Sequence, residues 1–318
     1  PRARAASRPE LALTSPGIRP KSVRKSGDLL GYGVIALSHE VVRRAQAFSE
    51  REEAMLKAHA VREVGAGEPP LVLLHGFGTD QTIWSRMAPR LAEKRRVILY
   101  DHMGSGASDF AHYDAERYQG LEGYADDLVE ILDALDLRDV DVVGHSVSGM
   151  ISLLASLRTD RIGRLVMIGA SARYLNDGGY EGGFEPKDVE DFLGLMELDF
   201  QGWARALAPR VMDQPDNPAL TQELVFSFSR ENAELTRRFA EATFMSDHRA
   251  QLAECGVPTA VLQAKADVVV PLPAARFLAD HIPRARLEIM DVRGHYPQLS
   301  APGTVIDAIE RFLAETPS

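Results

Sequence analysis

Short apolar segments alternate with amphipathic segments along the chain from residue 71 onward. The apolar segments have the length of buried strands, and the amphipathic segments carry apolar side chains at helical spacing. This alternation is typical of a parallel sheet that is covered by helices on both faces. We predict strands at 71–74, 97–100, 140–143, 165–168, 259–263 and 286–289, and helices at 81–91, 121–135, 150–157, 273–281 and 303–313.

The alternation stops between residues 171 and 250. This stretch contains no convincing strand, and Pro and Gly divide it into helical segments at 187–198, 201–212, 218–229 and 231–245. A helical block inserted between two sheet strands lies at the carboxyl ends of the strands, where open α/β sheets bind ligands. We therefore predict that residues 171–250 form a helical lid.

The first 56 residues have a different character. Residues 1–27 contain seven Arg or Lys residues but only one acidic residue, Glu10, which predicts a basic, disordered tail. An Arg-rich, acid-poor start is also compatible with a transit peptide, and the missing initial Met suggests a processed or truncated product. The pattern at 34–58 predicts an amphipathic helix and the one at 57–64 a hairpin, so we assign 28–56 to a helical extension and 57–318 to the main domain.

Composition narrows the function classes. The 318 residues are 45% hydrophobic and carry a formal charge of −10, which argues against nucleic acid as a partner. No apolar stretch approaches the roughly 18 residues that a membrane span needs. Cys255 is the only cysteine, so an intramolecular disulfide is impossible and a reducing, cytoplasmic location is expected. No His, Asp and Glu cluster has metal-binding spacing, so we expect neither a metal nor another cofactor.

A serine stands where a predicted strand turns into a predicted helix. The residues Gly-His-Ser-Val-Ser-Gly at 144–149 follow the strand at 140–143. In this context a sharp turn raises the serine above the sheet, so Ser146 is the candidate nucleophile. Ser148 stands where the usual motif has glycine.

Serine is a weak nucleophile at neutral pH and needs a base, which in turn needs an orienting group. His295 follows the strand at 286–289 in a loop at the carboxyl edge of the sheet, and Asp267 follows the strand at 259–263. Along the chain these residues follow in the order Ser, Asp, His, which is the order found in proteins with this strand–turn–helix serine motif. Asp291 is the rival acid, but it lies only four residues before His295.

Attack on a carbonyl also requires donors for the developing oxyanion. One is expected to be the backbone N–H of Val147, directly after the nucleophile. The other is expected from Phe77, which lies between two glycines in the loop after the strand at 71–74.

Motifs throughout residues 57–318 resemble the RsbQ-type α/β-hydrolases, which include a bacterial stress regulator and the plant strigolactone and karrikin receptors. The matching segments are HGFGTDQTIW (75–84), GSGASD (104–109), GHSVSG (144–149), YLND (174–177), GGF (182–184), FMSDHR (244–249), DVVVP (267–271) and GHYPQLSAP (294–302). The resemblance implies an α/β-hydrolase fold with a four-helix lid. It also implies that a serine at position 148, in place of the usual glycine, is normal for this family.

The resemblance also implies an apolar pocket with Ser146 at its base. The substrate-binding residues that it implies are Phe77, His145, Tyr174, Phe184, Trp203, Leu207 and Phe244. Tyr174 and Leu207 stand where the plant receptors usually have phenylalanine, so the identity of the ligand does not transfer.

Two functions follow from these observations. The first is a serine hydrolase that cleaves a small hydrophobic ester or lactone. The second is a signalling protein, similar to RsbQ or the butenolide receptors, that binds a small apolar ligand and a protein partner at the lid, with slow or incidental hydrolysis. Cofactor-free peroxidase activity uses the same three side chains and stays open as well.

Overall fold

The computed structural model describes residues 50–317. The chain divides into two units, Pro1–Arg44 and Ala45–Ser318, and only the second contains described residues. The predicted tail at 1–27 and residues 28–49 of the predicted extension lie outside the described range. Residues 50–58 are helical, in agreement with the pattern at 34–58. Among residues 50–317, no helix is both long enough and apolar enough to span a membrane.

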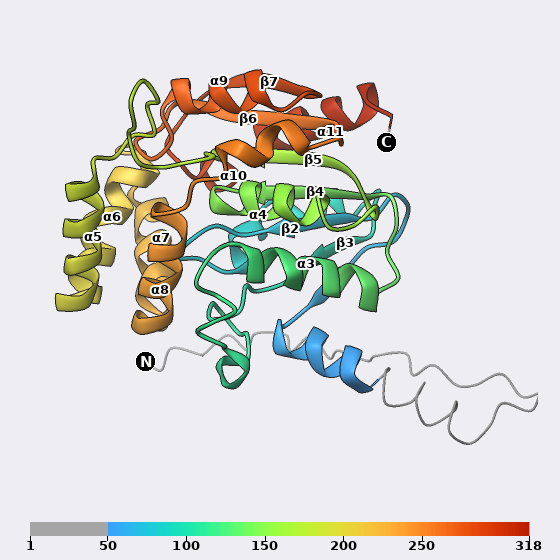
Figure 1. Cartoon of the computed structure of the whole chain (residues 1–318), viewed down its shortest axis with the longest axis horizontal. Coiled ribbons are helices and arrows are strands. Elements are labelled where there is room, and N and C mark those ends of the chain that lie inside the picture. The colour runs from blue at the N-terminus through green and yellow to red at the C-terminus, as the bar shows by residue number, and fades with distance from the viewer. Residues whose placement is uncertain (1–49, 318) are drawn as a thin grey trace, which may run out of the picture. The chain divides into compact units, whose positions relative to one another are not determined.

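A seven-stranded sheet lies at the centre of the second unit (Figure 1). Its order is β1-β3-β2-β4-β5-β6-β7, and every neighbouring pair is parallel except β1 with β3. This confirms the predicted mostly parallel sheet. The strands are β1 (Arg62–Val64), β2 (Leu71–Leu74), β3 (Val97–Leu99), β4 (Val140–His145), β5 (Ile162–Ile168), β6 (Thr259–Ala266) and β7 (Ala285–Arg293).

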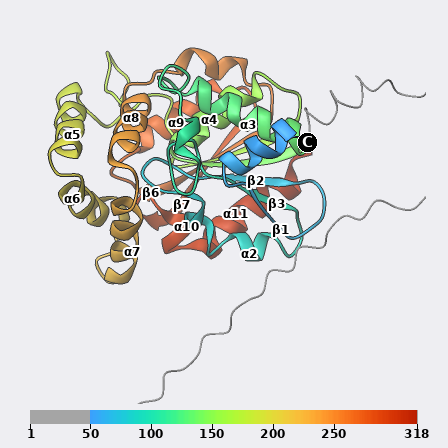
Figure 2. The ribbon, with the colours of Figure 1, turned by 90° about the horizontal axis from the view of Figure 1, so that it is seen from below.

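Helices cover both faces of this sheet (Figure 2). One face carries α3 (Glu122–Ala134), α4 (Val147–Ser156) and α9 (Leu272–His281), and the other carries α2 (Ala88–Leu91), α10 (Pro297–Ser300) and α11 (Pro302–Glu315). Strands β2 and β4 are buried along their whole length because helices lie on both sides of them. Three short 3₁₀ helices, at Gln81–Trp84, Phe110–His112 and Arg249–Glu254, lie in the connections.

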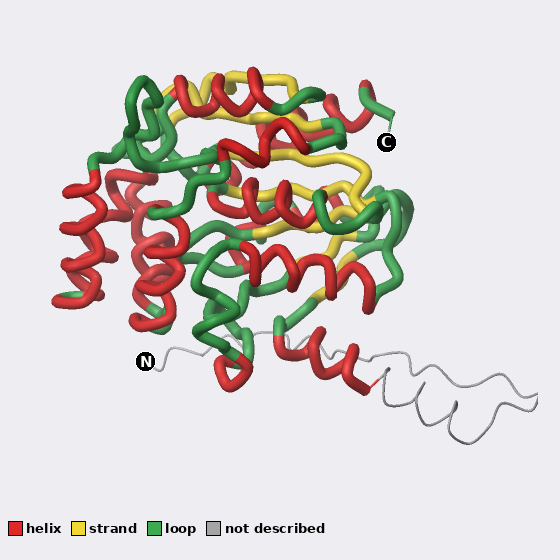
Figure 3. The backbone as a smooth tube through the Cα atoms, in the orientation of Figure 1, coloured by secondary structure: helices red, strands yellow, loops and turns green. Residues whose placement is uncertain are grey.

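Four further helices are inserted between β5 and β6. They are α5 (Pro186–Leu198), α6 (Phe200–Met212), α7 (Pro218–Ser229) and α8 (Ala233–Phe244), and Figure 3 shows them together at one end of the sheet. Since the insertion leaves from the last residue of β5, this end holds the carboxyl termini of the parallel strands. The four predicted helical segments are therefore present, close to their predicted bounds.

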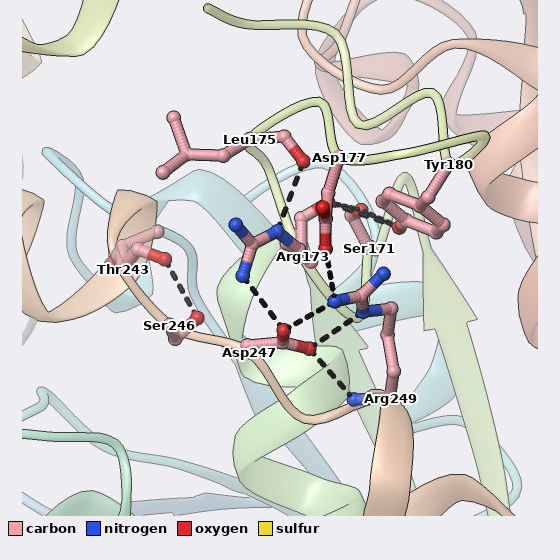
Figure 4. A network of polar contacts seen from close by, with 9 residues as sticks. All are labelled: Ser171, Arg173, Leu175, Asp177, Tyr180, Thr243, Ser246, Asp247 and Arg249. Carbon is pink, nitrogen blue, oxygen red and sulfur yellow. Dashed lines mark hydrogen bonds and ion pairs between the residues drawn. The ribbon is translucent and has the colours of Figure 1, made fainter. Parts of the chain in front are cut away.

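The two ends of the insertion are joined by charged side chains (Figure 4). Arg173 donates to Asp247 at 2.7 Å, and Arg249 bonds both Asp247 at 2.7 Å and Asp177 at 2.8 Å. Hydrogen bonds from Arg249 are the largest cause that lowers the pKa of the Asp247 carboxyl to about 2. Asp247 of the 244–249 motif thus has a structural role, because it accepts hydrogen bonds from both Arg173 and Arg249 and so joins the two ends of the insertion.

Two local predictions were wrong. The helix expected at 81–91 is a 3₁₀ turn at Gln81–Trp84 followed by the separate α2. A continuous helix would place Pro89 in its interior, where it lacks an N–H and clashes with the preceding turn, whereas in α2 it lies in the first turn. The hairpin expected at 57–64 is instead a helix end followed by β1, which pairs with β3.

Candidate active site

Ser146 lies between the end of β4 and the first residue of α4. Its backbone has φ 57° and ψ −125°, a conformation that costs energy for a residue with a Cβ and that is typical of functional turns. The turn is tight: a Cβ on Gly144 would lie 2.3 Å from the carbonyl oxygen of Ser148. The N–H of Ser146 donates to the Ile168 carbonyl at 2.8 Å, which ties the turn to the end of β5.

Ser148, which departs from the usual glycine, has a hydrogen-bonding role. Its hydroxyl donates to the His75 carbonyl at 2.5 Å and lies 2.7 Å from Nε2 of His102. The N–H of His102 in turn donates to Nε2 of His75 at 3.0 Å. Burial lowers the pKa of both imidazoles, so both are neutral at pH 7. The Ser148 hydroxyl therefore connects α4, which begins directly after Ser146, to the loop after β2.

The structure places the predicted base and acid beside Ser146. Nε2 of His295 lies 2.9 Å from Oγ of Ser146, and Nδ1 of His295 lies 2.8 Å from Oδ2 of Asp267. All three side chains are almost fully buried. Two backbone hydrogen bonds hold the loop that carries His295. The N–H of His295 donates to the carbonyl of Val211 in α6 at 2.7 Å, and the N–H of Gly294 donates to the carbonyl of Ala266 in β6 at 2.8 Å.

Asp267 is charged in these surroundings. Burial alone would raise the pKa of its carboxyl, but the electrostatic interaction and hydrogen bond with His295, together with two backbone donors, lower the pKa below its usual value. Oδ1 accepts from the N–H of Val269 at 2.8 Å and of Val270 at 3.2 Å. Gln263 donates to Oδ2 at 3.3 Å. These donors were not predicted, although an aspartate that begins a loop commonly accepts a hydrogen bond from the N–H two residues later.

The rival acid, Asp291, lies elsewhere. Its side chain is 90% exposed and pairs with Lys265 at 3.1 Å. Asp291 belongs to β7, and its side chain lies beside Lys265 of the neighbouring strand β6. Proximity in sequence therefore did not bring it to His295.

His145 lies behind the site. It is fully buried, its Nε2 donates to the carbonyl of His295 at 2.8 Å, and its ring lies 4.9 Å from the ring of Tyr296. Burial, followed by the neighbouring His295, lowers the pKa of His145 to about 3, so the ring is neutral at pH 7. The structure shows His145 holding the main chain of His295, and its predicted contact with substrate stays a prediction.

The two predicted oxyanion donors, Val147 and Phe77, belong to segments next to Ser146. Val147 is the first residue of α4, and the first N–H groups of a helix have no acceptor within the helix. The loop with Phe77 passes close to Ser146, since a Cβ on Gly76 would lie 3.1 Å from Cβ of Ser146. Tyr296 donates to the Phe77 carbonyl at 3.5 Å, which steadies the loop.

An aromatic cluster lies over this loop. The ring of Phe77 contacts Phe192, Trp203, Phe239 and Phe244 at centroid distances of 5.7–6.3 Å. These partners come from the insertion, so the ring of Phe77 joins the insertion to the sheet domain.

A cavity of about 510 Å³ opens between α5, α6 and the loop after Asp267. Three predicted substrate-binding residues line it: Phe184, Trp203 and Leu207. The other four predicted pocket residues are buried and do not line this cavity: Phe77, His145, Tyr174 and Phe244. The ring centroids of Tyr174 and Phe244 lie 5.1 Å apart. Ser146 is absent from the lining of this cavity, and the aromatic chain Phe184, Phe244, Tyr174 connects the cavity to it.

Tyr174 makes a contact that the sequence analysis did not expect. Its hydroxyl lies 3.3 Å from Oγ of Ser146, in addition to the contact of its ring with Phe244. No local pattern predicts such a contact, because it depends on how the 171–184 segment folds back over the sheet. Residues 50–317 contain no group of three or more His, Cys, Asp or Glu arranged to hold a metal ion.

Comparison with known proteins agrees with this geometry. A family profile described as "alpha/beta hydrolase fold" matches residues 69–250. Strigolactone esterase D14 of Arabidopsis thaliana is 37% identical over 261 residues, which cover 81% of this chain and 97% of the relative. The chain belongs to the α/β-hydrolase family.

Two further relatives support the same group. The karrikin insensitive 2 receptor CA of Petunia hybrida is 36% identical over 259 residues, which cover 81% of this chain and 96% of the receptor. The structure of the hydrolase olei00960 from Oleispira antarctica has a TM-score of 0.81 and 37% identity, and the match covers 83% of this chain and 98% of that one. The predicted membership of the RsbQ-type group of α/β-hydrolases is confirmed.

Proposed function

We propose that this α/β-hydrolase cleaves a small hydrophobic ester or lactone through Ser146, His295 and Asp267. The observation that carries the proposal is the continuous hydrogen-bonded series from Oγ of Ser146 through both ring nitrogens of His295 to Asp267. A serine hydroxyl, a neutral imidazole and a buried carboxylate in this order are what nucleophilic acyl transfer requires.

The proposed reaction begins when Nε2 of His295 takes the proton of Ser146 as Oγ attacks the ester carbonyl. The Asp267 carboxylate holds the proton on Nδ1 and stabilises the imidazolium. The N–H groups of Val147 and Phe77 would bind the oxyanion, a contribution that is typically worth about 100- to 1000-fold in rate per donor. His295 then protonates the leaving oxygen, and water repeats the sequence to release the acid.

The aromatic residues between the cavity and Ser146 support the substrate class. Phe184, Trp203 and Leu207 form an apolar part of the cavity wall, beside the charged residues Asp188, Asp191 and Arg210. The apolar part favours a compact hydrophobic substrate over a polymeric one. The insertion of α5–α8 would act as the lid over this substrate. The proposal includes a cytoplasmic location, where the buried free thiol of Cys255 would stay reduced.

The decisive test compares hydrolysis of p-nitrophenyl acetate by the wild type and by Ser146→Ala. We expect kcat/KM of the variant to fall by about 10⁴-fold or more. Ser152→Ala is the matched control, because Ser152 is equally buried in α4 and bonds only the carbonyl of Ser148. Full activity in Ser146→Ala would show that the proposed mechanism is wrong.

A receptor-like role is the second candidate, and the relatives favour it, since one is named a receptor. In this role the insertion would present a ligand-dependent surface to a protein partner. Ser146→Ala should then still bind a synthetic butenolide, and its thermal midpoint should rise with ligand concentration, since a ligand that binds only the folded state stabilises it. An unchanged midpoint at millimolar ligand would contradict the receptor-like role.

A further inference from the structure

The hydroxyl of Tyr174 lies within hydrogen-bonding distance of the proposed nucleophile, Ser146. It lies in the segment between β5 and α5, is 1% exposed, and its Oη is 3.3 Å from Oγ of Ser146. Its ring is held by Phe244, and its backbone carbonyl accepts from the N–H of Phe184 at 3.1 Å. The hydroxyl is therefore aimed at Ser146 by a packed ring and a fixed main chain.

The direction of this hydrogen bond follows from the other contacts of Ser146. Asp267 accepts the proton on Nδ1 of His295, so Nε2 carries the lone pair and accepts the only proton of Ser146. Oγ of Ser146 is left as an acceptor toward Tyr174. Burial raises the pKa of the Tyr174 phenol, so the phenol keeps its proton at neutral and mildly alkaline pH.

We propose that Tyr174 is a further catalytic residue, whose hydroxyl donates to Oγ of Ser146 and stabilises the negative charge on this oxygen when the acyl-enzyme bond breaks. The proposal rests on the serine mechanism given above. It adds a third donor to the site, directed at the ester oxygen of the acyl-enzyme, whereas Val147 and Phe77 would serve the carbonyl oxygen.

The two half-reactions use this donor differently. In acylation, Oγ loses its proton to His295 and forms a bond to the acyl carbon, and a donor on Oγ does not make it a better nucleophile. In deacylation, water gives a proton to His295 and a hydroxide to the acyl carbon. The bond from the acyl carbon to Oγ then breaks, the electron pair returns to Oγ, and His295 returns the proton. Tyr174 keeps its own proton throughout, so loss of its hydroxyl should slow deacylation more than acylation.

The test is pre-steady-state release of p-nitrophenol from p-nitrophenyl acetate by the wild type, Tyr174→Phe and Ser146→Ala. We expect the deacylation rate constant of Tyr174→Phe to fall by about 10-fold, below the effect of a full oxyanion donor because the contact is long. The acylation rate constant should change less than about threefold. The acyl-enzyme then accumulates, and the burst becomes larger relative to the steady-state rate.

Tyr180→Phe is the matched control. Tyr180 lies in the same segment, and its hydroxyl contacts Ser171 and the carbonyl of Arg173 instead of Ser146. A purely structural effect of Tyr174→Phe would lower both rate constants equally, and that result would overturn the inference. Deacylation that is slowed as much in Tyr180→Phe as in Tyr174→Phe would overturn it as well. The burst amplitude counts working sites, so misfolded protein does not enter the rate constants.

The two proposals fail in different ways. If Ser146→Ala abolishes the burst and Tyr174→Phe leaves deacylation unchanged, only the role of Tyr174 is wrong. A burst that persists in Ser146→Ala would overturn the serine mechanism and the role of Tyr174 with it.

Discussion

Asp267 shows how single atoms determine the state of His295. Oδ1 accepts two backbone N–H groups, from Val269 and Val270, and Oδ2 faces Nδ1 of His295. Because both backbone donors point at Oδ1, the position at Oδ1 requires an acceptor. The carboxylate meets this need and still accepts the Nδ1 proton, which leaves the lone pair of Nε2 toward Ser146.

Asp267→Asn should reverse this arrangement. The amide oxygen must take the position of Oδ1, so the NH₂ group faces Nδ1 of His295 and moves the imidazole proton to Nε2. His295 can then no longer accept from Ser146, and we expect kcat/KM for p-nitrophenyl acetate to fall by about 10⁴-fold. Asp291→Asn, at the exposed rival position, should keep wild-type kcat/KM. Equal losses in both variants would contradict the assignment of Asp267.

At the scale of elements, the turn from α7 to α8 is anchored to the sheet domain by charged groups. Arg230 pairs with Asp80, and Oε2 of Glu231 accepts from the N–H of Gly106 at 2.8 Å. Asp101 lies in the same cluster and accepts from the N–H of Ala107 at 2.8 Å. Burial, with added repulsion from Asp80 and Asp101, raises the pKa of Glu231 to about 8. The insertion is thus attached here by a carboxyl that is largely protonated at neutral pH.

This raised pKa predicts a loss of stability as the pH rises from about 4.3 to about 8. An unfolded glutamate titrates near about 4.3, so between that pH and about 8 the folded state holds a proton that the unfolded state has released. Stability from Glu231 should therefore fall as pH rises through this window. In Glu231→Gln the side chain stays neutral and keeps an oxygen for Gly106, so its thermal midpoint should fall less between pH 5 and pH 9.

The control for this measurement is Glu234→Gln in α8, where the side chain is 72% exposed and pairs only with Arg238. That variant should follow the wild-type midpoint across the whole pH range. If the curves for Glu231→Gln and the wild type are parallel, the Glu231 carboxyl does not titrate as proposed.

At the scale of the whole domain, the two ends of the sheet serve different purposes. The carboxyl ends hold Ser146, Asp267 and His295. Toward the opposite end, Asp141 of β4 accepts two hydrogen bonds from Arg164 of β5, at 2.6 and 2.9 Å. Arg164 also donates to the carbonyls of Leu313 and Thr316 near the end of α11. Asp141 also accepts from Arg95 at 2.8 Å. This buried group of charges joins two central strands to the last helix.

Asp141→Asn should therefore affect stability and leave catalysis intact. The variant leaves the Arg164 charge buried and uncompensated, and we expect the free energy of unfolding in urea to fall by about 3–5 kcal/mol. Asp133→Asn, in which the exposed Asp133 loses its ion pair with Arg161, should cost less than about 1 kcal/mol. A large drop in kcat/KM of folded Asp141→Asn would show that the two ends of the sheet are coupled.

Local patterns were sufficient for most of the fold. Each buried strand and each amphipathic helix has its own periodicity, so the alternation and the four inserted helices could be read without knowledge of their neighbours. The error at 81–91 has a local cause, because Pro89 interrupts the predicted helix. The error at 57–64 has a distant cause, because β1 pairs with β3, which lies about 35 residues later in the chain.

The candidate residues Ser146, Asp267 and His295 could be predicted because each follows a strand, and parallel strands bring their carboxyl ends to one edge. The hydrogen-bond partners could not, since they depend on contacts between segments far apart in the chain. Packing of the 171–184 segment brings the Tyr174 hydroxyl to 3.3 Å from Oγ of Ser146. Pairing of β6 with β7 places Asp291 beside Lys265. Periodicity in the sequence therefore specifies which residues lie at the edge of the sheet. Which polar atoms form hydrogen bonds is decided only by the tertiary structure, because a hydrogen bond is sensitive to differences of a few tenths of an ångström in the distance between donor and acceptor.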